Sequence, residues 1–186
     1  MAKTGSIQRF KTPPKLLDQG FGLRSERQGD QSFLESLYIS VRWPELDPSG
    51  WTDEAKLGFL QDQFALQDKH YAEYYAEAEF LLLEKQNVPL GRLYLYRART
   101  DIRIVDISLL PEVRNIGIGT ALLQDVIAEA IETGRSVSIH VEKFNPAQML
   151  YRRLGFREVE EKGPYWLMEW VQPGSANSIQ VHHDKT

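Results

Sequence analysis

A glycine-containing turn between a strand pattern and a helix pattern has the residue types that bind negatively charged groups. The segment from Leu109 to Thr120 reads Leu-Leu-Pro-Glu-Val-Arg-Asn-Ile-Gly-Ile-Gly-Thr. Gly117 and Gly119 have no side chains, so phosphate oxygens can approach the backbone there. The first N–H groups of a helix lack intrahelical partners and lie at the positive end of its dipole. Together with the charge of Arg114, the pattern predicts a site for a phosphate or diphosphate.

Two common nucleotide-binding motifs do not match this turn. A Walker loop needs Gly-Lys-Ser/Thr, whereas Gly119 is followed by Thr120 and Ala121. A dinucleotide-binding fingerprint needs a third glycine three residues further on, where this chain has Leu122. For the Gly-x-Gly pattern alone, a helix-capping turn without a ligand is the alternative interpretation.

A second segment favours the ligand-binding interpretation. It runs from Asn145 to Phe156 as Asn-Pro-Ala-Gln-Met-Leu-Tyr-Arg-Arg-Leu-Gly-Phe. In their order and spacing, the two segments resemble the GNAT superfamily of acetyltransferases. In that family an Arg/Gln-x-x-Gly-x-Gly/Ala loop holds the CoA diphosphate, and an Asn…Leu-Tyr…Leu-Gly-Phe segment flanks the thiol end. The resemblance extends from Phe21 to Val171, and it implies acetyl-CoA as co-substrate and no metal.

The resemblance assigns contacts with CoA to three parts of the chain. The diphosphate is expected on the turn, at Arg114, Asn115, Ile116, Gly117, Ile118, Gly119 and Thr120. The family has a bulge in the strand before the turn, where N–H groups meet the acetyl carbonyl and pantetheine; the matching residues are Ile107, Ser108 and Leu109. Asn145 matches the asparagine that bonds the pantetheine arm. It is equally suited to cap the helix beginning near Pro146, and both roles are compatible.

Tyr151 matches the general acid of the family. The departing CoA thiolate needs a proton or a hydrogen bond, and a nearby phenol supplies either. The amine attacks the thioester directly, so no serine or cysteine acyl carrier is required. The alternative interpretation makes Tyr151 a core aromatic residue of its short helix.

Deprotonation of the attacking amine requires a base, because amines of the lysine type are mostly protonated at neutral pH. His140 is the first candidate, since it lies on the polar face of a strand and has a suitable pKa. Some family members place a glutamate base at the corresponding position, so the histidine departs from that pattern. Glu142 shares the face and is the next candidate, ahead of Asp106 and Glu84. A chain of water molecules without a dedicated base is the further alternative.

The identity of the acceptor does not follow from the sequence. A small-molecule or peptide amine is expected, and the acidic balance of the chain favours a cationic one. Aromatic residues that would line its pocket, or else pack in the core, are Trp43, Trp51, Tyr71, Tyr74, Tyr75, Tyr165 and Trp166. A CoA-binding module without catalysis, serving regulation or assembly, is the alternative function.

The elements that must position these residues follow from hydrophobic periodicity. Strands are expected at 21–23, 79–84, 91–97, 102–109, 136–142, 156–160 and 165–171. Helices are expected at 30–41, from the N-cap Thr52 to about 75, at 117–132 and at 146–154. The hairpin-linked strands are antiparallel, and the step from Asp101 to Glu142 is strand–helix–strand and therefore parallel. The fold class is α/β, with a mixed, mainly antiparallel central sheet flanked by helices in the order β-α-α-β-β-β-α-β-α-β-β.

The two ends of the chain contain few apolar residues. Residues 1–18 are expected to form a loose leader and 173–186 a loose tail, around one domain at 19–172. The tail includes His182 and His183, which are a weak metal-binding signal and more simply solvated. Because family members often dimerise through edge strands, a homodimer through the strand at 165–171 is possible.

The bulk composition excludes several classes of protein. The 186 residues carry a net charge of −4, so no basic excess drives binding to nucleic acids. The absence of cysteine excludes disulfides, thiolate zinc sites and cysteine nucleophiles. No apolar run approaches the ~18 residues of a membrane span, and no hydrophobic signal segment follows the N-terminus. A cytoplasmic protein is therefore expected.

Overall fold

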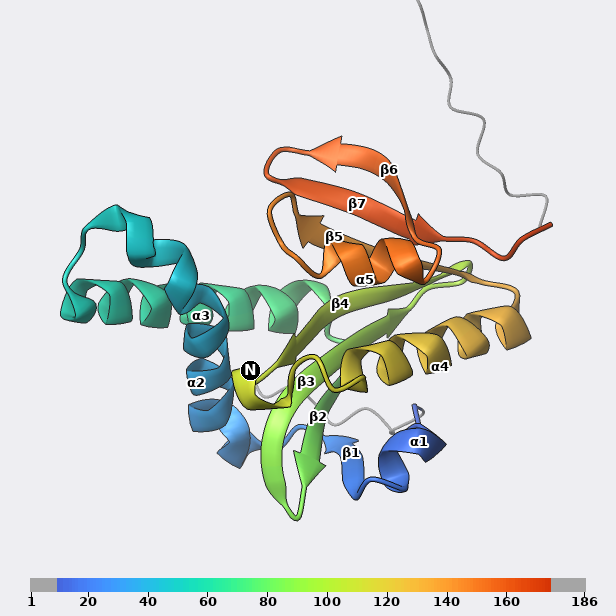
Figure 1. Ribbon diagram of the computed structural model, residues 1–186, viewed down its shortest axis with the longest axis horizontal. Helices are drawn as coiled ribbons and strands as arrows, with labels where there is room; N and C mark the ends of the chain where they lie inside the picture. Colours follow the sequence, from blue (N-terminus) through green and yellow to red (C-terminus); the bar gives the residue numbers. More distant parts are fainter. Residues whose placement is uncertain (1–9, 175–186) are drawn as a thin grey trace, which may run out of the picture.

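A computed structural model describes residues 10–174 of the chain as an α/β fold (Figure 1). The strands are β1 (Phe21–Ser25), β2 (Glu79–Lys85), β3 (Val88–Arg97), β4 (Asp101–Leu109), β5 (Ser136–Glu142), β6 (Arg157–Lys162) and β7 (Tyr165–Trp170). The α-helices are α1 (Pro14–Leu17), α2 (Gln31–Arg42), α3 (Asp53–Tyr74), α4 (Ile118–Thr133) and α5 (Gln148–Arg153). The strands form one sheet in the order β1-β2-β3-β4-β5-β7-β6. Only β4 and β5 pair in parallel, so the mixed, mainly antiparallel sheet expected from the sequence is confirmed.

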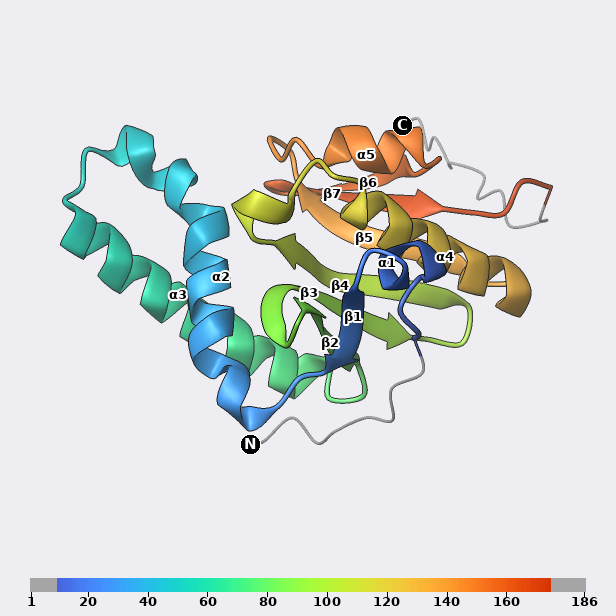
Figure 2. The ribbon, with the colours of Figure 1, turned by 60° about the horizontal axis from the view of Figure 1, so that its bottom comes forward.

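Helices cover both faces of the sheet, so the core has two parts, one on each face (Figure 2). The larger cluster contains Leu93 and Leu95 from β3 and the apolar residues of α4. The smaller cluster lies under α2 and α3 and contains Tyr94. Successive residues of a strand point to opposite faces, which is why the apolar run of β3 serves both clusters. The sheet between them is therefore buried on two sides where it carries the candidate site.

The ends of two elements follow the sequence signals closely. Thr52 caps α3, because its hydroxyl oxygen accepts a hydrogen bond from the N–H of Ala55 at 3.3 Å. The β2–β3 hairpin turns on Gln86 and Asn87, whose φ angles of 52° and 63° suit a two-residue turn. The turn is shorter than the sequence suggests, because Val88 and Pro89 already belong to β3 and pair with β2.

The described part of the expected leader packs against the domain. Phe10 and Leu16 are buried in the larger core cluster, and the N–H of Leu23 in β1 donates to the Thr12 hydroxyl at 2.7 Å. The expectation of a loose segment is therefore wrong for residues 10–18, because two apolar side chains are enough to anchor it. Residues 1–9 lie outside the described range, as do His182 and His183 in the tail.

The last strand is not at an edge of the sheet. β7 pairs with β5 on one side and with β6 on the other, so pairing of another copy with residues 165–171 is excluded in this fold. The edge strand is β6, which carries charged side chains along its length and a bulge at Val159. Charges and bulges on an edge strand oppose pairing with another sheet.

Candidate functional site

The start of α4 is open. Gly117 precedes its first turn with φ 92°, a conformation that favours glycine, and no side chain caps the helix. Among residues 10–174, the only backbone hydrogen bond recorded across this start is the helical one from Ala121 N–H to Gly117 C=O. Gly117, Gly119 and Thr120 are partly exposed, whereas Ile118 is buried and anchors the turn. The N–H groups of Ile118, Gly119 and Thr120 can therefore bind an anion.

Arg114 adds a positively charged side chain to this helix start. Its Nε donates a hydrogen bond to the Leu109 carbonyl oxygen at 2.9 Å, which holds the guanidinium against the end of β4. Its Nη2 is buried and has no hydrogen-bond partner within the described residues. A buried unpaired donor is costly, and a phosphate oxygen would satisfy it. The arrangement fits a diphosphate.

A gap in strand pairing lies beside this turn. β4 and β5 pair only from Asp101 with Ser136 to Ile104 with Ile139, although both strands continue beyond. The edge of β4 that faces β5 is therefore free of this ladder from Val105 onward. The expected bulge also lies there: Val105 is the extra residue opposite Leu95 and Tyr94 of β3.

The bulge was expected nearer the turn. Instead, Ile107, Ser108 and Leu109 pair in regular register with β3. Their place in the bulge is a wrong prediction, although their β5-facing edge lies along the same gap. Gly91 explains the tight packing here, because a Cβ atom at this position would lie 2.6 Å from both the Ser108 carbonyl oxygen and the Leu109 side chain.

Tyr151 lies on α5 and is buried among the larger core cluster. Its ring packs edge-on against Phe156, with centroids 5.8 Å apart. Burial raises the pKa of its phenol, and the negative charge of Asp106 raises it further. Tyr151 therefore keeps its proton near neutral pH.

Asn145 precedes α5 and fulfils the local part of its expected function. Its side-chain oxygen accepts a hydrogen bond from the Ala147 N–H at 2.9 Å, which fixes the turn into the helix. The side-chain amide NH2 group still has donors for another partner. The structure thus shows the capping interaction; the contact with pantetheine stays a prediction.

His140 is exposed on the face of β5 opposite α4. Its Nδ1 lies 3.0 Å from Nη1 of Arg103 on β4, so Nδ1 accepts the hydrogen bond and Nε2 carries the proton in the neutral ring. Partial burial lowers the pKa of His140, and the charges of Arg103 and Lys162 lower it further. The ring is therefore neutral near pH 7, but the lone pair of Nδ1 already accepts the hydrogen bond from Arg103.

The other acidic candidates are engaged in ion pairs. Glu142 binds Arg42 of α2, which links that helix to the end of β5. Glu84 binds Arg24 at 2.7 Å across β1 and β2. Both contacts fit a structural function for these carboxylates.

Asp106 belongs to a buried polar network that connects α3 with β3 and β4. Its carboxylate accepts hydrogen bonds from Tyr71 at 2.9 Å, Arg92 at 2.6 Å and Ser108 at 2.7 Å. Arg92 also donates to Gln67 at 2.7 Å, and its buried Nε has no partner within the described residues. Desolvation of a buried charge opposes folding, so such a charge is normally paired, as Asp106 and Arg92 are here.

Sequence reasoning missed Arg92 and Gln67 as members of the site and assigned Tyr71 only to a possible pocket. The available signal was a single arginine in the apolar strand Gly-Arg-Leu-Tyr-Leu and a single aspartate in Ile-Val-Asp-Ile. A charge on each of two neighbouring buried strands indicates an ion pair. Its partners on α3 depend on packing that periodicity does not specify.

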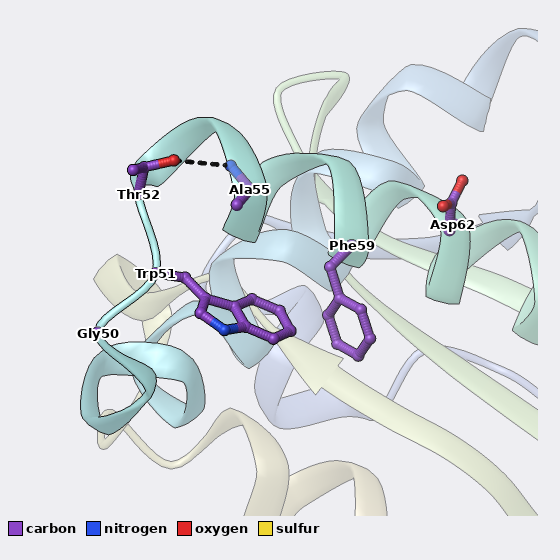
Figure 3. Close-up of a pocket in the computed structure, with 6 residues that line it drawn as sticks. All are labelled: Gly50, Trp51, Thr52, Ala55, Phe59 and Asp62. Atoms are coloured by element: carbon purple, nitrogen blue, oxygen red, sulfur yellow. Dashed lines mark hydrogen bonds between the residues drawn. The ribbon is translucent and has the colours of Figure 1, made fainter.

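The aromatic residues proposed for an acceptor pocket do not gather in one place. Tyr71 is buried at the polar network, Tyr165 lies beside Glu142, and Trp166 contacts Lys143. Trp51 instead lines a shallow hollow of about 600 Å³ at the start of α3 (Figure 3). This hollow belongs to the helical hairpin that projects beyond the sheet, away from α4 and α5 (Figure 1). It is not part of the candidate site.

Fold and site together define a class of protein: an α/β domain whose open helix start, beside a gap between two parallel strands, can bind a diphosphate-linked substrate. The family model described as "Acetyltransferase (GNAT) family" matches residues 42–156, more than half of the chain. The chain therefore belongs to the GNAT acetyltransferase family.

A curated relative is an N-alpha-acetyltransferase of Sulfurisphaera tokodaii, 36% identical over 66 residues. The match covers 34% of this chain and 40% of that protein, less than two thirds of its length.

Solved structures share the fold at low sequence identity. The PaiA N-acetyltransferase of Thermoplasma acidophilum in complex with coenzyme A has a TM-score of 0.60 and 17% identity, over 80% of this chain and 97% of that one. Arabidopsis thaliana Naa50, in complex with the bisubstrate analogue CoA-Ac-MVNAL, has a TM-score of 0.54 and 18% identity, over 81% and 98% of the two chains.

Proposed function

We propose that this protein is an N-acetyltransferase that transfers the acetyl group of acetyl-CoA to a primary amine. The observation that carries the proposal is the open start of α4, with the unpaired Nη2 of Arg114 beside it. In this proposal the diphosphate lies on the backbone N–H groups from Asn115 to Thr120. The pantetheine arm enters the gap between β4 and β5 and meets the Asn145 amide, which brings the thioester toward Tyr151.

The amine attacks the thioester carbonyl directly. A C–N bond forms, the C–S bond breaks, and the amine loses one proton. His140 receives this proton at Nδ1 when the Arg103 guanidinium moves away from that nitrogen. Tyr151 stabilises the leaving thiolate by a hydrogen bond and supplies its proton. Asp106 has no free role in proton transfer, because three donors already occupy its carboxylate; its negative charge keeps the phenol protonated.

The acceptor is proposed to be a peptide or a small molecule with a free primary amine. The curated relative is named for acetylation of an alpha-amine, and the analogue bound to Naa50 joins CoA to a peptide. The net charge of −4 favours a cationic amine at long range.

A thiol-release assay with acetyl-CoA tests this function across a panel of amines. The panel contains the peptide Met-Val-Asn-Ala-Leu with a free N-terminus, the same peptide with a blocked N-terminus, spermidine and free lysine. We expect CoA release with at least one free amine and none with the blocked peptide. Binding of CoA without release for any amine would instead identify a non-catalytic CoA-binding module.

A further inference from the structure

A single arginine joins two carboxylates at the end of β5. Nε of Arg42 lies 3.0 Å from a carboxylate oxygen of Glu45, in the turn after α2, and its Nη1 binds the Glu142 carboxylate. Solvent reaches part of each of the three side chains. One guanidinium offsets only one of the two negative charges. Burial raises the pKa of Glu45 despite the charge of Arg42, and the charge of Glu142 adds to this rise. A further cation beside the two carboxylates would therefore be stabilising.

Two tyrosine side chains flank this charged cluster of Arg42, Glu45 and Glu142. Tyr165 of β7 is the cross-strand neighbour of Glu142, so their side chains lie on the same face of the sheet. Tyr38 precedes Arg42 by one turn of α2 and is 9% exposed. Burial raises the pKa of its phenol, and the charges of Arg42, Glu45 and Glu142 also act on it. Within residues 10–174 this phenol makes no hydrogen bond. A buried phenol without a partner, next to unbalanced carboxylates, is a feature of a binding site rather than of a closed ion pair.

The charged cluster lies beside the proposed site of acetyl transfer. Glu142 ends β5, in the part of the strand that no longer pairs with β4. Its carbonyl oxygen accepts hydrogen bonds from the Asn145 N–H at 3.0 Å and from the Gln148 side-chain amide at 2.8 Å, which tie it to the start of α5. His140 lies two residues earlier on the same face of β5, so the two side chains begin about 7 Å apart. A molecule bound at the cluster is thus within reach of the proposed base.

From this geometry we infer that the charged cluster recognises the acceptor by binding a second positively charged group close to the reacting amine. The inference rests on the proposed function. The two carboxylates attract an ammonium or guanidinium group, and the phenols of Tyr38 and Tyr165 add hydrogen-bond acceptors and ring faces. Arg42 holds the carboxylates together, but its charge opposes the incoming cation. The preferred acceptors are therefore diamines and peptides that begin with a basic residue, rather than neutral or acidic amines.

Acceptors that differ only in the second charge test this inference. The peptides Lys-Val-Asn-Ala-Leu and norleucine-Val-Asn-Ala-Leu form one pair, and cadaverine and pentylamine form the other. Thiol release from acetyl-CoA gives kcat/KM for each acceptor. In whichever pair is acetylated, we expect the charged member to be preferred at least about tenfold, as for a complementary charge at an interface. Equal values, or a preference for the neutral member, would overturn the acceptor inference and leave acetyl transfer in place. Absence of release with any amine would overturn the proposed function, and the inference with it.

Substitutions in the charged cluster should change this preference in opposite directions. Glu45→Gln and Glu142→Gln each remove a carboxylate charge and should lower the preference for the charged acceptor about tenfold. Arg42→Gln removes the opposing charge, so the preference should increase although two ion pairs are lost. Glu73→Gln removes the same charge from an exposed position of α3 and should leave the preference unchanged. If the ion pairs only hold the fold together, Arg42→Gln and Glu142→Gln will impair both members of a pair equally, and that result would overturn the inference.

Discussion

Tyr151 is the residue on which the proposed chemistry most depends. Its burial and the negative charge of Asp106 keep the phenol protonated. We expect Tyr151→Phe to lower kcat by about 100-fold, within the range for loss of a general acid, and to leave the KM for acetyl-CoA nearly unchanged. The replacement keeps the ring contact with Phe156, so the melting temperature should change little. Steady-state kinetics with an amine that gave turnover checks this, and undiminished kcat would exclude the acid function.

The contact between Arg103 and His140 leads to a prediction about pH. Burial is the largest cause of the lowered pKa of His140, and the positive charge of Arg103 is the next. Arg103→Gln removes that charge, so the pKa of His140 should rise. Because the neutral ring is the proposed base, the fall of kcat/KM on the acid side should then move to higher pH.

The pH profile needs a control for other titrating groups. His140→Gln should abolish this acid limb, provided that His140 is the base. An unmoved limb in Arg103→Gln, or a limb that persists in His140→Gln, would assign proton transfer to a water chain or to another residue.

Single residues were predictable where their function is local. Thr52 and Asn145 each bond a backbone N–H within three positions, and such caps follow from residue type and sequence spacing. The contact of Arg103 with His140 and the network around Arg92 join residues distant in sequence. Their geometry depends on strand register, which the sequence pattern leaves open.

At the scale of elements, the contact between β3 and the end of β4 depends on Gly91. A methyl group there would approach the Ser108 carbonyl oxygen and the Leu109 side chain to 2.6 Å. We expect Gly91→Ala to destabilise the fold by about 1–3 kcal/mol, as overpacking does. Thermal unfolding measures this. Gly58→Ala in α3, where a Cβ atom meets nothing within 4 Å, is the control and should be neutral or stabilising.

The network between α3 and the two central strands leads to a second prediction at this scale. Asp106→Asn leaves the buried guanidinium of Arg92 without its carboxylate, so the free energy of unfolding should fall by about 3 kcal/mol. Ser108→Ala removes one hydrogen bond to the same carboxylate and should cost only about 1 kcal/mol. Denaturant titrations compare the two. Equal losses would contradict a charge-based network.

The order and type of the elements followed from periodicity, whereas their edges and irregularities did not. The amphipathic pattern of α4 and its closing Gly134 predicted that helix to within a residue or two. The bulge at Val105 and the internal position of β7 depend on which strands become neighbours. Apolar alternation is the same for central and edge strands that are covered on one face, so it does not specify neighbours.

At the scale of the whole molecule, each layer has one proposed task. We propose that the layer of α4 and α5 holds CoA and the acid, and the layer of α2 and α3 covers the polar network around Asp106 on the other face of the sheet. The expected loose leader failed in its described part because Phe10 and Leu16 complete the core beneath α1. No helix within residues 10–174 is long and apolar enough to cross a membrane.

The claim on which the proposed function rests is that the first N–H groups of α4 bind the CoA diphosphate. Amide NMR of 15N-labelled protein measures this directly during titration with CoA and, separately, with pantetheine, which lacks the diphosphate. We predict that CoA shifts the amide resonances of Ile118, Gly119 and Thr120, and that pantetheine at equal concentration leaves them in place. Millimolar CoA that leaves these three resonances unmoved would contradict the claim.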